Sequence, residues 1–573
     1  MQGIPHMEGI HRTMKKQGYT LVLVLATAAF GWTLYAVFGG GKMLQSTEVS
    51  PLIRLNTIGY LPDSPKQASV AGKFSRFAVV RVRDGKKVYE GEAAETVTNA
   101  DTDEQITIAD FSALKTPGEY RLEIPDIGFS PPFRIGTDVY DFPFYTIMKG
   151  MYLWRCGTAV SGKHNGDTFA HEACHTEDAY LDYVGGGHVR RDATGGWHDA
   201  GDYNKYVVNA GVTVGVMLRA WEDFGTRLRR VRLDIPESGG KLPDYLAEIK
   251  WEIDWLLKMQ AEDGSVYHKI STRQFGPFIP PEQEKEPRFY AGWSTAATAD
   301  FVAMTAGFAR AVRPYDASTA KRCLQAARKS WEFLQRHPED HKSDTRGLIT
   351  GGYQTDDPDD RLWAVAELWE TTGDPALLKD LEERIRAQGA RIDHDFDWAN
   401  VRNLGMITYL LSRRGGKDSA LMNQVKTNLI ATAERIVQTA RSHGYARPLG
   451  DAYYWGCNGS VARQAVVLHA AYRVTKKPEY LNAMLDALNH LFGRNFYGRS
   501  FVTGLGYQPP MRPHDRRSGG DKVDAPWPGY LVGGSHPGAR NWHDVQDDYR
   551  TNEIAINWNA ALIYALAAFV SSP

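Results

Sequence analysis

The pattern of apolar and polar positions divides the chain into two parts. Between residues 50 and 136, apolar and polar side chains alternate in short runs, separated by turn signals such as Asp84-Gly85 and Pro117-Gly118. Alternation with a period of two is typical of strands that bury one face, and this spacing predicts an immunoglobulin-like β-sandwich. The segment holds no carboxylate pair and no cluster of metal-type ligands. We therefore interpret it as a structural module.

From residue 137 to residue 573 the apolar positions recur with helical spacing, which predicts a large all-α domain. The predicted helices span roughly 140–156, 204–225, 243–260, 294–312, 317–336, 360–372, 375–388, 397–413, 417–442, 458–475, 478–493 and 552–570. Long non-helical stretches remain at 157–203, 261–293 and 494–551. Loops of this length inside a compact domain are usually functional or disordered, so we expect the functional residues there.

A basic segment and an uncharged segment precede both parts. Residues 1–16 carry Arg12, Lys15 and Lys16, whereas residues 17–41 carry no charge and are mostly apolar. A basic front followed by an apolar run is typical of an export signal, and this run reaches the length of about 20 residues that spans a bilayer. We expect an uncleaved signal anchor with residues 1–16 in the cytoplasm, or a cleaved signal peptide. The protein would then be anchored to the inner membrane facing the periplasm, or secreted.

Composition narrows the class of partner. The net charge is -1 and no basic cluster is present, which argues against nucleic acid. The 15 Trp and 28 Tyr residues suit core packing, and their flat rings also suit stacking on sugars. The 4 Cys residues are too few for a disulfide scaffold.

The densest group of reactive side chains lies between Gly195 and Tyr206, with the sequence GGWHDAGDYNKY. Asp199 and Asp202 stand on either side of Gly201, just before a predicted helix. Two carboxylates at this spacing can face one space, where one holds a water and the other polarises it, as hydrolysis by general base catalysis requires. The alternative is an Asp that caps the helix beside an aromatic turn. Spacing alone does not decide between them.

Three segments together resemble glycoside hydrolase family 9, the inverting cellulases. GGWHDAGDYNKY resembles the catalytic-base signature of this family, residues 500–516 resemble its His-containing motif, and residues 544–559 resemble its general-acid motif. The segments occur in family order. Residues 56–62 resemble the start of the immunoglobulin-like module found in one branch. The resemblance implies an (α/α)6-barrel catalytic domain over residues 137–573, partly covered by the β-sandwich.

The resemblance also assigns catalytic roles. Asp202 would be the base that activates water, Asp199 would help to orient that water, and Glu553 would be the acid that protonates the leaving oxygen. In an inverting enzyme the two carboxyl groups lie about 6.5–9.5 Å apart, which leaves room for the water. Without the resemblance, Glu553 could be an ordinary first-turn residue favoured by the helix dipole. The candidates for substrate binding are His198, His514, Arg516, Tyr549 and Trp455.

A structural zinc site is predicted in the loop before the catalytic pair. Its candidate ligands are Cys156, Cys174, His175 and His188, and two Cys with two His form a tetrahedral zinc set. This chain resembles the family branch with the immunoglobulin-like module, in which two Cys and two His of this region hold zinc, so the resemblance implies the same site here. His171 and His198 are rival ligands. The alternative is two buried thiols with surface histidines.

An acidic cluster suggests a second metal. Asp356, Asp359 and Asp360 precede an apolar helix, and clustered carboxylates suit calcium. The family to which the chain is similar has calcium near this point. First-turn carboxylates at a helix N-terminus explain the cluster equally well.

The expected function is hydrolysis of β-1,4-glucosidic bonds in cellulose or cellodextrins by a monomer. The alternatives are an exo-acting glucosaminidase on chitosan oligomers and a catalytically dead carbohydrate-binding protein. Asp199, Asp202 and Glu553 favour an enzyme, because a binding protein needs neither a base nor an acid.

Overall fold

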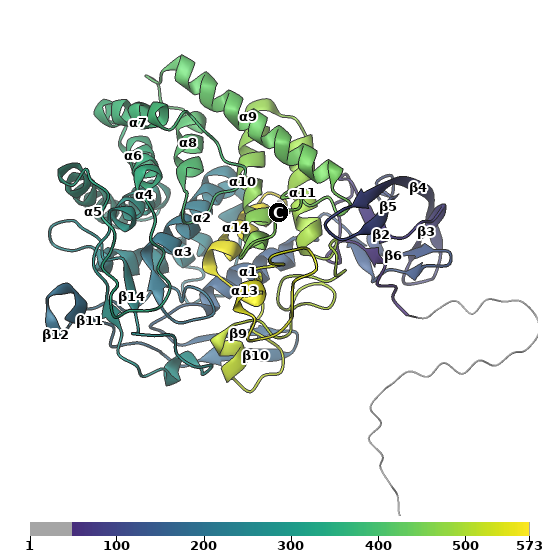
Figure 1. Cartoon of the computed structure of the whole chain (residues 1–573), viewed down its shortest axis with the longest axis horizontal. Coiled ribbons are helices and arrows are strands. Elements are labelled where there is room, and N and C mark those ends of the chain that lie inside the picture. The colour runs from purple at the N-terminus through teal and green to yellow at the C-terminus, as the bar shows by residue number, and fades with distance from the viewer. Residues whose placement is uncertain (1–47, 572–573) are drawn as a thin grey trace, which may run out of the picture. The chain divides into compact units, whose positions relative to one another are not determined.

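The computed structural model describes residues 48–571 (Figure 1). The predicted export segment at 1–16 and 17–41 lies outside these residues. Within residues 48–571, no helix has the length and apolar character needed to cross a membrane.

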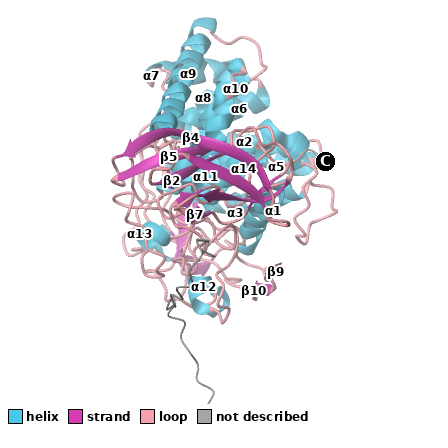
Figure 2. Ribbon diagram, turned by 90° about the vertical axis from the view of Figure 1, so that its right-hand side faces the viewer, coloured by secondary structure: helices cyan, strands magenta, loops and turns pink. Residues whose placement is uncertain are grey.

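The first module is an antiparallel β-sandwich (Figure 2). Its strands are β1 (Ile53–Arg54), β2 (Gln67–Ala71), β3 (Arg76–Arg81), β4 (Lys87–Asn99), β5 (Glu104–Asp110), β6 (Gly118–Ile124), β7 (Gly128–Phe129) and β8 (Phe133–Ile135). They follow the order β1-β2-β5-β4-β3-β6-β7, with β8 on β6. The long strand β4 pairs with β3 in its first half and with β5 in its second, after a register shift between Ala93 and Thr96, so it joins the two sheets. The alternating apolar positions form the core, as predicted.

The second module is the predicted helical barrel. Its long helices are α1 (Asp141–Leu153), α2 (Val207–Leu228), α3 (Asp244–Met259), α4 (Thr295–Val312), α5 (Ala317–Arg336), α6 (Pro358–Thr372), α7 (Pro375–Ala387), α8 (Arg402–Leu411), α9 (Ser419–Ser442), α10 (Cys457–Thr475), α11 (Glu479–Leu491) and α14 (Ile556–Ala567). Helices α2, α4, α6, α8, α10 and α14 pack in a closed ring. The others pack outside this ring, which gives the (α/α)6 arrangement. Two short helices, α12 (Arg516–Gly520) and α13 (Tyr549–Asn552), were not predicted.

Burial explains which helices are inner and which are outer. The inner helix α4 buries almost every residue, including small ones such as Ala299 and Ala303. A helix that is apolar on all sides belongs in a core. The outer helix α5 buries one face only. Both begin at side-chain caps: Ser294 accepts from the backbone N–H of Ala297, and Asp316 accepts from those of Ser318 and Thr319.

The sandwich packs on loops at one side of the barrel. The hydroxyl of Ser69 donates to the carbonyl oxygen of Gly444, 2.7 Å away, in the loop after α9. The Asn56 amide donates to the side chain of Asn489 in α11 at 3.0 Å. These buried hydrogen bonds hold the module against the barrel.

The long connections form small sheets around one end of the barrel. Strands β9 (Val160–His164) and β10 (Asp167–His171) form a hairpin. A second sheet has the order β12-β11-β15-β14-β13. Its members are β11 (Tyr180–Leu181), β12 (Gly187–Arg190), β13 (Lys205–Tyr206), β14 (Lys269–Ser271) and β15 (Phe289–Tyr290). Strand β13 leads directly into α2, so this sheet supports the loop that carries Asp199 and Asp202.

Candidate active site and metal cluster

Asp199 and Asp202 lie in a buried loop at the start of α2. Asp199 accepts hydrogen bonds from Asn209 Nδ2 and from the Tyr353 hydroxyl, both at 2.7 Å. Asp202 accepts from Asn204 Nδ2 at 2.5 Å and from the Tyr206 hydroxyl at 3.1 Å. Both carboxyl groups are thus held in fixed orientations. The helix-cap alternative does not apply, because α2 begins at Val207 without a side-chain cap.

Glu553 reaches this loop from the far end of the sequence. Glu553 forms a parallel β-bridge with His514. The carbonyl oxygen of Gly201 accepts from Arg516, from its backbone N–H at 3.1 Å and from Nη1 at 2.8 Å. A Cβ at Gly201 would stand 2.2 Å from the His514 carbonyl oxygen, so no side chain fits. The segment from His514 to Arg516 therefore joins the predicted acid to the loop of the predicted base.

Burial and mutual repulsion change the protonation of these groups. Burial, with the charge of Asp202, raises the pKa of Asp199 to about 8. Burial, followed by the charges of Asp202 and Asp199, raises the pKa of Glu553 well above its ordinary value. The raised pKa favours the protonated form of Glu553, which is the state that a general acid needs.

The predicted substrate-binding residues His514, Tyr549 and Trp455 lie in ring contact with one another. His514 Nδ1 donates to the Gln546 carbonyl oxygen at 2.7 Å, so its proton is on Nδ1. Trp455 is 50% exposed and Tyr549 is 41% exposed, and their ring centroids lie 5.3 Å apart. Exposed rings of this kind suit stacking on a sugar. The Arg516 guanidinium bonds backbone carbonyls of Gly201 and Gly276 and is buried, so its first role is to hold the loop.

Tyr353 and Asn209, which donate hydrogen bonds to Asp199, were not predicted from the sequence. Tyr353 precedes α6 and Asn209 lies within α2, and neither belongs to a motif. Only the fold brings Tyr353 within hydrogen-bond distance of Asp199. A local pattern could not have revealed this contact.

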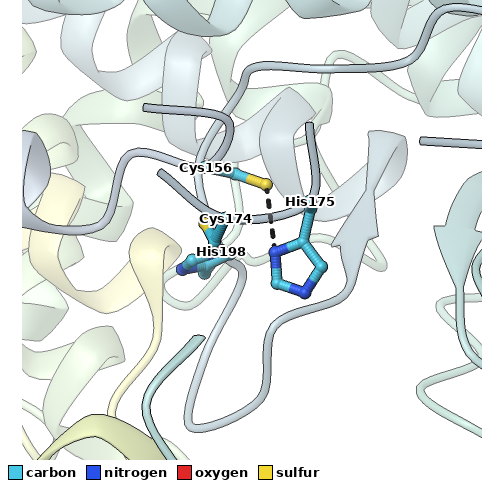
Figure 3. Close-up of side chains that lie close together, drawn as sticks. All are labelled: Cys156, Cys174, His175 and His198. Carbon is cyan, nitrogen blue, oxygen red and sulfur yellow. Dashed lines mark hydrogen bonds between the residues drawn. The ribbon is translucent and has the colours of Figure 1, made fainter. Parts of the chain in front are cut away.

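A second cluster lies beside the catalytic loop (Figure 3). It contains Cys156, Cys174, His175 and His198, whose potential ligand atoms all lie within 4.8 Å of one another. Cys156 Sγ lies 3.7 Å from His175 Nδ1, and Cys174 Sγ lies 3.7 Å from His198 Nε2. Among residues 48–571, this is the one group of three or more such side chains able to hold a metal ion.

Two predictions for histidines were wrong. His188 lies on strand β12, its side chain is 67% exposed, and it pairs with Asp182 at 3.2 Å. It takes no part in the cluster, because the β11–β12 hairpin carries it to the surface. His198, predicted to bind substrate, is fully buried and faces Cys174. His198, named above as a rival zinc ligand, therefore takes the place of His188 in the cluster.

Two buried charged residues, Glu284 and Arg288, contact side chains of this cluster. His175 Nε2 lies 3.1 Å from a Glu284 carboxylate oxygen, which leaves Nδ1 directed at Cys156. Arg288 Nη2 donates to Cys156 Sγ at 3.3 Å. The same guanidinium donates to the carbonyl oxygen of Tyr203, next to Asp202. The cluster and the catalytic loop thus share a support that the sequence did not indicate.

The predicted calcium ligands do not converge. Asp356 is exposed and pairs with Lys342 at 2.8 Å. Asp359 accepts from the backbone N–H of Val401 at 2.7 Å. Asp360 is fully buried beside Asp300. Asp356 lies before α6, whereas Asp359 and Asp360 are consecutive residues of its first turn and have different partners, so we do not retain this ligand set.

The comparisons with known proteins agree with this geometry. Residues 140–566 match the protein family described as "Glycosyl hydrolase family 9", and residues 48–128 match the family described as "Cellulase N-terminal ig-like domain". The chain is 53% identical to "Endoglucanase D" of Acetivibrio thermocellus over 571 residues, which cover 98% of this chain and 88% of that protein.

Solved structures are similar over most of the chain. A metagenome-derived glycoside hydrolase family 9 endoglucanase has a TM-score of 0.85 and 34% identity, covering 91% of this chain and 99% of that one. AaCel9A, solved with a cellobiose-like isofagomine, has a TM-score of 0.82 and 31% identity, covering 91% of this chain and 100% of its own. The chain therefore belongs to glycosyl hydrolase family 9, with an immunoglobulin-like domain ahead of its catalytic barrel.

Proposed function

We propose that the protein is an endo-acting glucanase that hydrolyses β-1,4-glucosidic bonds of cellulose or cellodextrins with inversion at the anomeric carbon. The observation that carries the proposal is the arrangement around Gly201. The pKa of Glu553 is raised by burial and by the charges of Asp202 and Asp199, and Glu553 forms a β-bridge with His514, whose carbonyl oxygen lies against Gly201 beside Asp202. The names of the relatives and the family membership support the same activity.

The chain's own groups account for each proton. Asp202 accepts a proton from a water molecule on one face of the sugar ring, and that water attacks the anomeric carbon. Asp199 helps to orient this water. Hydrogen bonds from Tyr353 and Asn209 hold Asp199 in place. Glu553 gives its proton to the leaving glycosidic oxygen on the other face. The exposed rings of Trp455 and Tyr549 provide stacking surfaces for the glucan chain.

The size distribution of the first products tests this proposal. An endo-acting β-1,4-glucanase should cut cellohexaose at internal bonds and lower the viscosity of a soluble cellulose derivative early in the reaction. Glucosamine hexamer, incubated in parallel, should remain intact. Release of single sugars alone from one chain end, or faster cleavage of the glucosamine hexamer, would instead support the exo-acting glucosaminidase.

We also infer that the cluster of Cys156, Cys174, His175 and His198 holds a structural zinc ion. Thiolate and imidazole ligands at zinc distances of about 2.3 and 2.0–2.1 Å stand roughly 3.6 Å apart along a tetrahedral edge. The Cys156–His175 and Cys174–His198 pairs both lie at 3.7 Å, which fits. Glu284 and Arg288 supply the outer hydrogen bonds that such ligands usually have. All four ligand positions are protein side chains, so this ion would have no open position for substrate.

The replacement Cys174→Ser should lower the zinc content from about one ion per chain to nearly none, because a closed four-ligand site needs each ligand. The melting temperature should fall by several degrees, since metal-binding free energy contributes to folding. Elemental analysis and thermal melts measure both. Cys323→Ser is the matched control, because Cys323 is a buried thiol in α5 outside the cluster. Unchanged zinc and melting in Cys174→Ser would exclude the site.

Our proposal for where the protein acts in the cell comes from its sequence. We propose that residues 17–41 direct export, and that the catalytic domain acts on polysaccharide outside the cytoplasm. A cell fractionation that finds the full chain in the cytoplasm would contradict this proposal.

A further inference from the structure

Lys269 is a completely buried residue of strand β14 that has no role in the hydrolysis described above. Its ammonium group donates to the carbonyl oxygens of Leu348 at 3.1 Å and Gly351 at 3.0 Å, and to Thr350 Oγ1 at 2.9 Å. An ammonium group has three N–H donors, so all of them are used. All three acceptors belong to one loop before α6, residues 348–353. Lys269 therefore connects β14 to loop 348–353 by three hydrogen bonds.

The same loop holds both carboxylates of the predicted base pair. At its end, the Tyr353 hydroxyl donates to Asp199 at 2.7 Å. At its centre, the backbone N–H of Gly351 donates to the Tyr206 hydroxyl at 3.1 Å. That hydroxyl in turn donates to Asp202 at 3.1 Å. The position of the loop therefore affects Asp199 and Asp202 together.

Lys269 also lies directly beside Tyr206. The two residues are opposite each other in the antiparallel pair of β13 and β14, and the ammonium nitrogen lies 5.7 Å from the centroid of the Tyr206 ring. A Cβ at Gly351 would stand 3.0 Å from Cζ of this tyrosine, so the loop and the ring are in close contact. A displacement of the loop would therefore move the hydroxyl group that orients Asp202.

Lys269 is mostly a cation at neutral pH despite its burial. Burial lowers the pKa of Lys269 to about 8, and the negative charge of Asp202 acts in the opposite direction. Because the folded state favours the neutral amine, burial of the cation costs stability below about pH 8, and this cost disappears as the pH rises above the ordinary pKa of lysine. An apolar side chain would avoid the cost. The hydrogen bonds to loop 348–353 account for a cation at this place.

We propose that Lys269 is a positioning residue for the base of the reaction. By anchoring loop 348–353, it keeps Asp199 and Asp202 in the geometry that orients the attacking water. The inference rests on the proposed function, since it concerns the support of that base. A small misplacement of a catalytic group lowers the rate of the chemical step, because the reacting atoms must be held in a near-attack arrangement.

Steady-state kinetics of Lys269→Met on cellohexaose test the proposal. Methionine fills much of the same space but has no charge and no N–H donor. We expect kcat to fall by about 10–10²-fold with an unchanged KM, because the anchor acts on the chemical step and not on binding of the glucan. A kcat equal to that of the wild type, or a raised KM with an unchanged kcat, would overturn the proposal.

The matched control is Lys66→Met. Lys66 is also buried, and its ammonium group also donates to three oxygens, the backbone carbonyls of Leu61, Pro62 and Ser64, but it lies in the β-sandwich. This variant should have a lower melting temperature and the kcat of the wild type. A loss of kcat in Lys66→Met as large as that in Lys269→Met would contradict a role specific to Lys269.

Thr350→Val decides the question if Lys269→Met does not fold. Valine has nearly the shape of threonine and leaves Lys269 in place, but it removes one of the three acceptors. We expect a smaller loss of kcat with an unchanged KM, and a well-folded Thr350→Val enzyme with the kcat of the wild type would overturn the proposal. Wild-type protein that does not hydrolyse cellohexaose would instead contradict the proposed function itself.

Discussion

Replacement of Asp202 by asparagine should lower kcat on cellohexaose by about 10²–10⁴-fold, the range supplied by a general base. The amide has nearly the same shape and its oxygen can still accept from Tyr206 and Asn204, but it cannot take a proton from water. Steady-state kinetics measure the loss. Circular dichroism, thermal melting and zinc content should match those of the wild type.

The control for this variant is Asp192→Asn. Asp192 lies in the same connection, but its side chain is 63% exposed and contacts Lys258 at 3.0 Å. Because Asp192 is exposed and its contacts are a surface ion pair and hydrogen bonds from its neighbour Thr194, activity should remain near that of the wild type. A well-folded Asp202→Asn enzyme with normal turnover would remove Asp202 from the role of base.

Replacement of Glu553 by glutamine should have an effect that depends on the leaving group. Cellohexaose needs a proton on its glycosidic oxygen, so kcat should fall by about 10²–10⁴-fold. A dinitrophenyl cellobioside releases a stable anion without protonation, so its hydrolysis should fall far less. Comparison of the two substrates on wild type and variant isolates the acid role. Equal losses on both substrates would contradict it.

The pH profile gives this variant a second readout. Burial, with the charges of Asp202 and Asp199, raises the pKa of Glu553. The acid form therefore persists above the usual carboxyl range, and activity on cellohexaose should fall only as pH rises through this raised pKa. With the dinitrophenyl substrate, the Glu553→Gln variant should lack that alkaline limb. An unchanged alkaline limb would assign it to another group.

Much of the fold could be predicted because local pattern dictated it. The alternating runs of residues 50–136 became strands, and every long helix of the barrel coincides with a predicted one. Helix α4 shows why, since its apolar residues recur over 18 residues and Ser294 caps its start. Helices α12 and α13 span 5 and 4 residues and carry too little periodicity to be recognised.

The site could be predicted only where a continuous motif carried it. Asp199, Asp202 and Glu553 stand in such motifs, and the structure brings them together around Gly201. His188 failed because sequence separation does not fix the path of a loop, and the β11–β12 hairpin turns it outward. His198 was misassigned because its motif also carries the catalytic pair, although its side chain faces Cys174.

Contacts between distant segments left no signal in the sequence. Tyr353 stands 154 residues from Asp199, and Arg288 stands 132 residues from Cys156. Asp356, Asp359 and Asp360 appeared to form one ligand set because they are close in sequence. In the structure, Asp356 lies before α6, whereas Asp359 and Asp360 are neighbours in its first turn, where consecutive side chains point in different directions.

The anomeric form of the first product tests the central claim most directly. Wild-type protein is mixed with cellohexaose, and proton NMR spectra are recorded before the new reducing ends can mutarotate. With Asp202 as base and Glu553 as acid on opposite faces of the sugar, the new reducing ends should appear first as the α-anomer. Initial formation of the β-anomer would mean retention through a covalent intermediate and would contradict the account.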